Sequence, residues 1–220
     1  MRKLSLLGCL SALTIVMAPA SGSAQSWTDW TGITSTTVTG SLAGVQVTYT
    51  GGFAGASLVG GTNYWSPSGA YTQGGLTAPN LNDFIQIVDP VSGTISFSSA
   101  VVNPYFALIS VGAPGTAVTY TFDSPFTILS TNLVNCAFWG CGTYSTGANS
   151  LTGTEFSGTI QFIGTFSSIS FTTDPSENWH GFTVGADRAA EVVPEPATMS
   201  LLATGLAGMA AAARKRRKSA

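Results

Sequence analysis

The chain has 220 residues, and its charged fraction of 8% is about one third of the roughly 25% usual in soluble domains. Seven of the eight basic residues lie within the first three or the last seven positions, so the body, residues 25–193, carries nine carboxylates and one arginine, a net charge of −8. A body with one cation cannot neutralise a phosphate backbone, which excludes nucleic-acid binding. Its plentiful aromatic and branched aliphatic residues exclude a disordered chain.

Residues 1–24 have the pattern of a secretory signal peptide. Arg2 and Lys3 precede the uncharged run 4–17, and small residues follow at Ala20 and Ala24. The apolar run is too short to be a membrane-spanning helix. We therefore expect export through the Sec translocon and cleavage by signal peptidase after Ala24, with Ala20 as the alternative site.

The body, residues 25–190, is rich in Ser, Thr and Gly and contains short alternating runs. A period of two predicts strands with one buried face, and four runs alternate strictly: 45–49, 94–98, 117–122 and 167–171. Further strands are expected at 83–88, 105–111, 126–131, 133–138, 159–165 and 181–184. Turn clusters separate these segments, and no stretch of the body has a helical period over eleven or more residues. This pattern predicts an all-β fold, an antiparallel β-sandwich of jelly-roll type.

The aromatic residues in the loop-like segments of the sequence are candidates for sugar binding. They are interspersed with Asn, Gly and Ser, and a sugar platform needs aromatic faces beside amides and carboxylates. Tyr64 and Trp65 are the leading pair, and the others are Trp27, Trp30, Tyr71, Trp139 and Trp179. The alternative is that these rings cap the ends of the sandwich.

Two cysteines remain after loss of the signal peptide, because Cys9 leaves with it. If the chain is exported, Cys136 and Cys141 meet an oxidising compartment, and we expect a disulfide that closes a hairpin-sized loop. A redox-active or metal-binding pair is the alternative, but the C-x-x-C spacing and neighbouring histidines are missing.

No catalytic motif occurs in the sequence. His180 is the single histidine, with Glu177 three residues upstream, and G-x-S-x-G, H-E-x-x-H, P-loop and dinucleotide patterns are absent. We expect no catalytic residue, a structural or surface role for His180, and no enzyme activity. A carboxylate pair would be the route to a glycosidase, and the available acids are Asp83, Asp89, Asp123, Glu155, Asp174 and Glu177.

No cofactor and no metal site are expected. Most of these acids fall in predicted turns, where an aspartate commonly forms an Asx-turn. Calcium held by turn carboxylates and loop carbonyls remains an alternative, although the D-x-[DN]-x-[DN]-G pattern is missing.

The C-terminal segment 191–220 has three parts. Val193, Pro194, Glu195 and Pro196 cannot lie inside a helix or a sheet ladder, so we expect an extended, accessible segment. An uncharged run at 197–213 follows, which at 1.5 Å per residue gives about 25 Å, the lower limit for a membrane span. The basic cluster that ends it places the tail in the cytoplasm and the body outside, and consists of Arg214, Lys215, Arg216, Arg217 and Lys218. A soluble amphipathic helix with a solvated basic tail is the alternative.

This three-part arrangement resembles the PEP-CTERM sorting signal. The resemblance implies recognition by exosortase, a membrane transpeptidase-like enzyme, followed by removal of the tail and release or re-anchoring of the body. Genomes with this system usually also make exopolysaccharide. Segments 94–112 and 178–185 also resemble bodies of other PEP-CTERM exported proteins, which implies a β-sandwich and transfers no active site.

These features together predict an exported, non-enzymatic protein, anchored transiently in the inner membrane and destined for the cell surface or the extracellular matrix. Its expected partners are exosortase, signal peptidase, the Sec translocon and, at its destination, exopolysaccharide. The alternative is a secreted carbohydrate-active enzyme or carbohydrate-binding module delivered by the same tail. A third hypothesis is a protein that stays anchored by an unprocessed tail.

Overall fold

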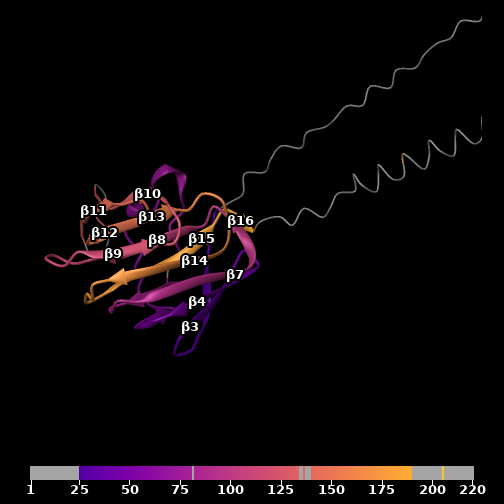
Figure 1. The fold of residues 1–220 in the computed structure, drawn as a ribbon, viewed down its shortest axis with the longest axis horizontal. Coiled ribbons are helices and arrows are strands. Elements are labelled where there is room, and N and C mark those ends of the chain that lie inside the picture. The colour runs from indigo at the N-terminus through magenta and orange to yellow at the C-terminus, as the bar shows by residue number, and fades with distance from the viewer. Residues whose placement is uncertain (1–24, 81, 134–135, 137–139, 190–204, 206–220) are drawn as a thin grey trace, which may run out of the picture.

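The computed structural model describes residues 25–80, 82–133, 136, 140–189 and 205. Two antiparallel sheets pack face to face (Figure 1). Sheet A has seven strands, in the spatial order β10 (Thr127–Thr131), β13 (Phe156–Gln161), β8 (Tyr105–Val111), β15 (His180–Ala186), β6 (Phe84–Ile87) and β5 (Gly55–Ser57), with β1 (Ser26–Trp27) paired to β15. Sheet B has nine strands, in the order β11 (Thr143–Thr146), β12 (Ser150–Thr154), β9 (Val118–Phe122), β14 (Thr165–Asp174), β7 (Ser92–Val102), β4 (Val45–Gly51), β3 (Thr37–Leu42) and β2 (Asp29–Ile33), with β16 (Arg188–Ala189) paired to β7.

The strand order is that of a jelly roll. When β6, β7, β8, β9, β12, β13, β14 and β15 are numbered 1 to 8 along the chain, sheet A contains the order 1-8-3-6 and sheet B the order 2-7-4-5. Two interlocked Greek keys produce this arrangement. The prediction of an all-β fold with antiparallel sheets is therefore confirmed.

The predicted strands agree with the structure at most positions. The strictly alternating runs lie in β4, β7, β9 and β14, and the predicted segment 105–111 coincides with β8. Segment 133–138 is an exception, because Leu133 lies in a turn and Cys136 in irregular chain, while residues 134–135 and 137–138 lie outside the described residues. The chain turns there into a disulfide loop, so the expected strand at its described positions is wrong.

The main core lies between the two sheets and is rich in phenylalanine. Phe106 and Phe182 come from sheet A, and Phe122 and Phe171 come from sheet B. Their ring centroids lie 5.2 to 5.9 Å apart, mostly in edge-to-face pairs. This separation is the favourable one for aromatic contacts, so the rings join the two sheets through their shared face.

A second, smaller core covers the outer face of sheet A. Strand β8 is buried along its whole length. Phe106, Leu108 and Val111 face the main core, whereas Tyr105, Ala107 and Ile109 face this second core. The segment between β5 and β6, which includes two short 3-10 helices, Ser68–Ala70 and Gln73–Gly75, supplies the cover with Trp65, Ala70 and Tyr71. Both faces of sheet A are thus removed from water at its centre.

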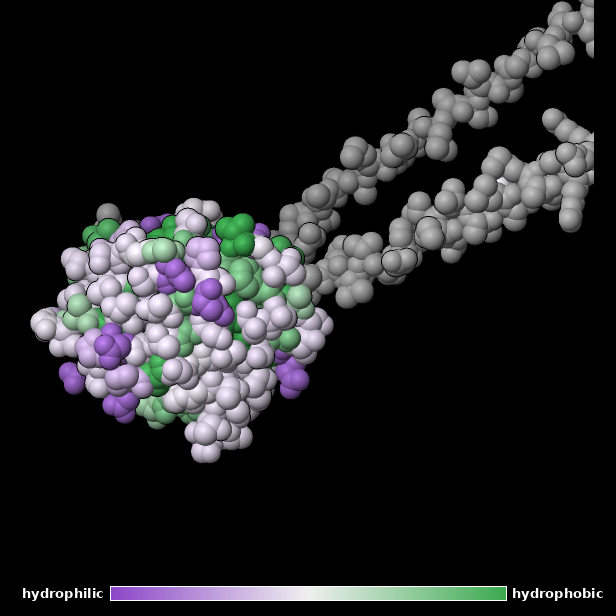
Figure 2. Space-filling model, in the orientation of Figure 1, coloured by the Kyte–Doolittle hydropathy of each residue, from purple (hydrophilic) through white to green (hydrophobic). Residues whose placement is uncertain are grey.

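Hydroxyl groups line the outer face of sheet B. Ser and Thr occupy successive positions across the strands in three rows, which are Thr39, Thr48, Ser96 and Ser168; Thr37, Thr50, Thr94 and Ser170; and Ser92, Thr172, Thr121 and Ser150. The hydroxyls of Thr94 and Ser170 lie 3.0 Å apart. Figure 2 shows few purple, strongly hydrophilic residues among the near-white ones in view. The low charge of the sequence is therefore a property of a hydroxylated surface.

The body has two ends that differ in what they carry. At one end, the exit pole, Ser26 pairs with Ala186, and Arg188 pairs with Val102, so both ends of the body leave from the same place. Figure 1 shows β16 at this right-hand end and the arrowhead of β14 pointing to the opposite end. The opposite end, the distal pole, contains Ser92, Val111 and Asp174. Strand β7 runs between the poles over 11 residues, or about 33 Å.

Candidate functional site

The candidate sugar-binding residue Trp65 is buried. Its side chain is 1% exposed, and its ring packs edge-on against Tyr71 with centroids 5.1 Å apart. No face of the Trp65 ring is open to a ligand, because the second core surrounds it. This corrects the expectation for Trp65 and agrees with the alternative, that the ring caps the sandwich.

Tyr64 belongs to an aromatic group that reaches the distal pole. Its ring lies 4.7 Å from Phe84 and 5.4 Å from Trp179, measured between centroids. Tyr64 and Trp179 are both half-buried. The aromatic residue that borders a cavity in this region is thus Trp179, and Tyr64 packs behind it.

We call this cavity the distal cavity. It has a volume of about 140 Å³ and is lined by Ser110, Ala113, Glu155, Glu177, Asn178 and Trp179. Three segments supply these residues: the end of β8 with the turn that follows it, the turn between β12 and β13, and the loop between β14 and β15. The cavity combines two carboxyl groups, a hydroxyl, an amide and an aromatic ring. Sequence reasoning named both glutamates among the available acids but did not bring them together.

A β-bulge sets the direction of Ser110. Between the pairs Val111 with Phe156 and Leu108 with Gly158, strand β8 has two residues and β13 has only Ser157. Ser110 adopts a left-handed φ of 53°, and its N–H donates to the Ser157 hydroxyl over 3.0 Å. Bulges of this kind redirect a side chain next to a site.

Glu155 is held by its backbone and its side chain. It also has a left-handed φ, 55°, and its N–H donates to the carbonyl of Gly112 over 3.0 Å. The Ser110 hydroxyl donates to Glu155 Oε2 over 2.8 Å. Two non-glycine residues in a sparsely populated conformation therefore meet at one cavity, and surrounding contacts must hold them there.

Asn132, in the turn that follows β10, supplies those contacts and is fully buried. Its Nδ2 donates to the carbonyls of Gly140, over 2.9 Å, and Glu155, over 2.8 Å, while its Oδ1 accepts from the N–H of Ser157 over 3.0 Å. One amide thus links the disulfide loop to the backbone on both sides of the bulge. Sequence reasoning missed Asn132, because an asparagine in a turn-like stretch of sequence gives no signal of burial.

The disulfide between Cys136 and Cys141 is present and confirms the prediction. It closes the loop that Asn132 binds through Gly140. Gly142 follows, and a Cβ atom there would lie 2.0 Å from the Glu155 carbonyl oxygen, so only glycine allows this approach. Gly142, directly after the disulfide, therefore packs on the backbone that carries Glu155.

The two carboxyl groups of the distal cavity have different surroundings. Burial raises the pKa of Glu177 to about 7; the N–H of Trp179, which donates to Oε1 over 3.0 Å, opposes the rise, and the charge of Glu155 adds to it. The Oε2 atom of Glu177 is buried and has no hydrogen-bond partner among the residues that the structure describes. Because desolvation disfavours the charged form, Glu177 holds a proton near neutral pH more readily than a free glutamate does.

His180 lies inside the sandwich, 1% exposed. Its Nδ1 is 3.0 Å from the hydroxyl of Tyr120, and burial lowers the pKa of His180 to about 4. A buried, neutral imidazole bonded to a core tyrosine acts as a structural group.

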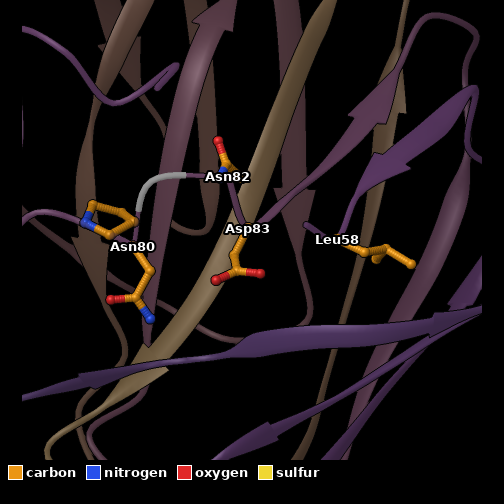
Figure 3. Close-up of a pocket in the computed structure, with 5 residues that line it drawn as sticks. Leu58, Asn80, Asn82 and Asp83 are labelled. Atoms are coloured by element: carbon orange, nitrogen blue, oxygen red, sulfur yellow. The ribbon is translucent and has the colours of Figure 1, made fainter. Parts of the chain in front are cut away.

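A second cavity, of about 490 Å³, lies near Asp83 and is lined by Leu58, Pro79, Asn80, Asn82 and Asp83. Figure 3 shows the Asn82 side chain turned away from the Asp83 carboxylate. Asp83 Oδ1 accepts from the N–H of Trp30 over 3.1 Å, and burial raises the pKa of Asp83 to about 6. This carboxylate bonds the backbone where the chain crosses into sheet B.

No group of three or more His, Cys, Asp or Glu side chains that could hold a metal ion occurs in the part of the chain that the structure describes.

The sorting residues Val193, Pro194, Glu195 and Pro196, the expected span 197–213 and the basic cluster 214–218 lie outside the described residues, apart from Gly205. The expected signal peptide, 1–24, also lies outside them. No helix within the described ranges is long and apolar enough to cross a membrane.

The comparisons with known proteins bear on the tail. A family model of the PEP-CTERM protein-sorting motif matches residues 192–217, a range that contains Val193 to Pro196 and most of the basic cluster. No curated protein and no solved structure matches the chain. The motif implies exosortase as the processing partner, together with export and sorting to the cell surface. The chain therefore carries a PEP-CTERM protein-sorting motif, which supports its assignment as a PEP-CTERM exosortase substrate.

Proposed function

We propose that this protein is a non-enzymatic surface or matrix protein, anchored transiently in the inner membrane, processed by exosortase at its tail, and associated with exopolysaccharide through its body. The match to the sorting motif at residues 192–217 carries the proposal. The confirmed disulfide is consistent with the oxidising compartment that an exported body reaches.

The arrangement of the poles supports this route. Strand β16 ends at Ala189, and the four residues 190–193 that precede Pro194 can span at most about 14 Å. A body held by its tail therefore stays close to the membrane at the exit pole, while the distal pole points away from it. The hydroxylated, weakly charged surface suits a hydrated polysaccharide matrix, in which uncharged hydrogen-bonding groups replace water contacts.

Processing is tested in cells that contain exosortase and in matched cells without it. We expect mature protein from the first to lack the peptide 214–220 and protein from the second to retain it, as read by mass spectrometry of the C-terminus. Glu195→Ala should retain the tail in both, whereas Asp174→Asn, in the body, should be processed normally. An intact tail on mature protein in exosortase-containing cells would contradict processing and favour the permanently anchored protein.

The carboxyl pair of the distal cavity favours a second candidate, a secreted carbohydrate-active enzyme. Glu155 and Glu177 line one cavity, and burial raises the pKa of Glu177 to about 7, as a general acid requires. A panel of chromogenic glycosides incubated with the mature protein tests this candidate. Hydrolysis that Glu155→Gln and Glu177→Gln each abolish would establish the enzyme, and no hydrolysis by the wild-type protein would leave the binding function.

A further inference from the structure

We propose that the distal cavity binds a single neutral or amino sugar ring of an extracellular polysaccharide, with Glu155 and Asn178 bonding ring hydroxyls and Trp179 forming an apolar wall. The inference rests on the proposed function, because it names the part of the body that would meet exopolysaccharide. It concerns residues outside the sorting motif, so the two can fail separately.

The chemistry of the lining matches that of a sugar ring. A pyranose presents hydroxyls that donate and accept hydrogen bonds around its edge and C–H groups on its faces. The Glu155 carboxylate accepts, the Asn178 amide donates and accepts, and the Trp179 ring offers a surface for C–H contact. Apolar walls with a few placed polar groups are typical of small-molecule sites.

The size of the cavity restricts the ligand. At about 140 Å³ it is smaller than the roughly 300–1,000 Å³ of sites for drug-sized ligands, so it can accept no more than one ring of a chain and leaves the rest outside. Asn178 is exposed and Trp179 half-buried, so the mouth of the cavity is accessible at the pole that points away from the sorting tail.

Charge determines which sugars can enter. Within the described part of the chain, two glutamates line the cavity and no Lys or Arg does, and the body around it has a net charge of −8. A uronic acid would bring a third carboxylate beside Glu155 without a cation to pair with it. Neutral sugars avoid this repulsion, and an amino sugar gains attraction to Glu155.

The cavity is organised before a ligand arrives. The bulge at Ser110, the left-handed backbone of Glu155 and the three hydrogen bonds of Asn132 fix the Glu155 carboxylate in place, and its contact with the Ser110 hydroxyl sets its orientation. A site that is already ordered loses less entropy on binding, which is how a small contact area can still bind a ring.

The test uses mature protein purified from exporting cells and four probes: the methyl glycosides of glucose, N-acetylglucosamine, glucosamine and glucuronic acid. Binding is measured by saturation-transfer NMR and by titration calorimetry. We expect millimolar binding of at least one of the first three probes and weaker binding of the glucuronide. Glu155→Gln and Asn178→Ala should each weaken binding by about tenfold. Asp89→Asn, an exposed change of the same charge at the same pole, should leave it unchanged.

The proposal would be overturned if none of the four probes bound at about 20 mM, far above a millimolar dissociation constant. It would also be overturned if Glu155→Gln and Asn178→Ala bound as tightly as the wild-type protein, or if the protein preferred the glucuronide. Thermal unfolding of each variant shows whether it is folded, and Asn178→Ala, at an exposed position, keeps the test valid if Glu155→Gln is unstable. Tail processing should be normal in all variants. Normal processing without sugar binding would reject the sugar site and leave the sorting function standing.

Discussion

The two poles of the body are stabilised in different ways. At the exit pole the two ends of the body are held by two-residue strands, β1 and β16, which pair with the ends of β15 and β7. At the distal pole a buried amide, a bulge and a disulfide hold Glu155 through side-chain bonds and a covalent link. Short edge pairings open at low free-energy cost, whereas buried polar networks open only with the core. The pole beside the sorting tail is therefore the more adaptable one, and the pole that points away from it is the more rigid.

Replacing one asparagine at each pole, Asn132 at the distal pole and Asn103 at the exit pole, tests this comparison most directly. Asn132→Ala removes three side-chain hydrogen bonds and leaves the buried groups of Gly140, Glu155 and Ser157 without their partner, so we expect the free energy of unfolding to fall by about 3–4 kcal/mol. Asn103→Ala, at a half-buried position of the exit pole, should lower the free energy of unfolding by about 1–2 kcal/mol.

Urea unfolding of both variants, followed by tryptophan fluorescence, gives the two values. Equal losses would contradict the difference between the poles. Asn103 has a left-handed φ of 48°, so Asn103→Gly serves as a control that removes the side chain without adding backbone strain.

Acidification should affect His180 and the two carboxyl groups with raised pKa values, Glu177 and Asp83, in opposite directions. The pKa of His180 is lowered from 6.5 to about 4 in the folded protein, so the unfolded chain takes up a proton first as the pH falls. Its contribution to stability is present above pH 6.5 and is lost as the pH falls toward 4, a loss on the order of 3 kcal/mol. The raised pKa values of Glu177, about 7, and Asp83, about 6, act in the opposite direction, because the folded state then holds protons that the unfolded state has lost.

The unfolding free energy measured from pH 8 to pH 4 in single variants tests these signs. Glu177→Gln should make the protein lose stability more steeply on acidification, because the opposing group is gone. His180→Gln should make stability rise between pH 7 and pH 4.5, since Glu177 and Asp83 then act without His180. The same slope in both variants would show that neither group titrates as its surroundings require.

The disulfide contributes a smaller amount to the same pole. A loop of this length, with the cysteines five residues apart, should contribute about 2 kcal/mol through the entropy of the unfolded chain. We expect Cys136→Ser with Cys141→Ser to lower the midpoint of urea unfolding accordingly. A two-hydrogen mass increase of the peptide that carries both cysteines, on reduction, checks the bond itself. A double variant as stable as the wild type would mean that Asn132 alone fixes the loop.

Much of the fold could be predicted because apolar and polar residues alternate in the strands that face the main core. Strand β9, for example, buries Val118, Tyr120 and Phe122 and exposes Thr121. Strands β3 and β12 were not predicted, since glycine interrupts their apolar positions. A Cβ atom at Gly40 would lie 2.4 Å from the carbonyl of Asp29, and one at Gly153 would lie 2.7 Å from the carbonyl of Val111. The approach of a distant backbone requires these glycines, and no local pattern reports it.

The candidate site was harder to predict than the fold. Trp65 lies in a segment rich in Gly, Ser and Pro, a composition typical of an exposed loop. This segment nevertheless covers the second core on sheet A. Glu155 and Ser110 come together through a bulge and two left-handed residues, which depend on pairing between strands far apart in the chain. The sorting motif, in contrast, is a contiguous pattern, and for that reason the sequence alone was sufficient to find it.

The smallest loss of unfolding free energy is expected for a change at Asp187, where the chain leaves the exit pole. Asp187 accepts hydrogen bonds from the Tyr105 hydroxyl and, over 3.4 Å, from Asn103 Nδ2. Asp187→Asn keeps an acceptor oxygen but removes the charge, so we expect the unfolding free energy to fall by only about 1 kcal/mol. Sugar binding at the distal cavity should be unchanged, because about 33 Å of strand separates the poles. A loss above 3 kcal/mol in urea unfolding, or weakened sugar binding, would show that the poles are coupled and that the chain exit helps to order the distal site.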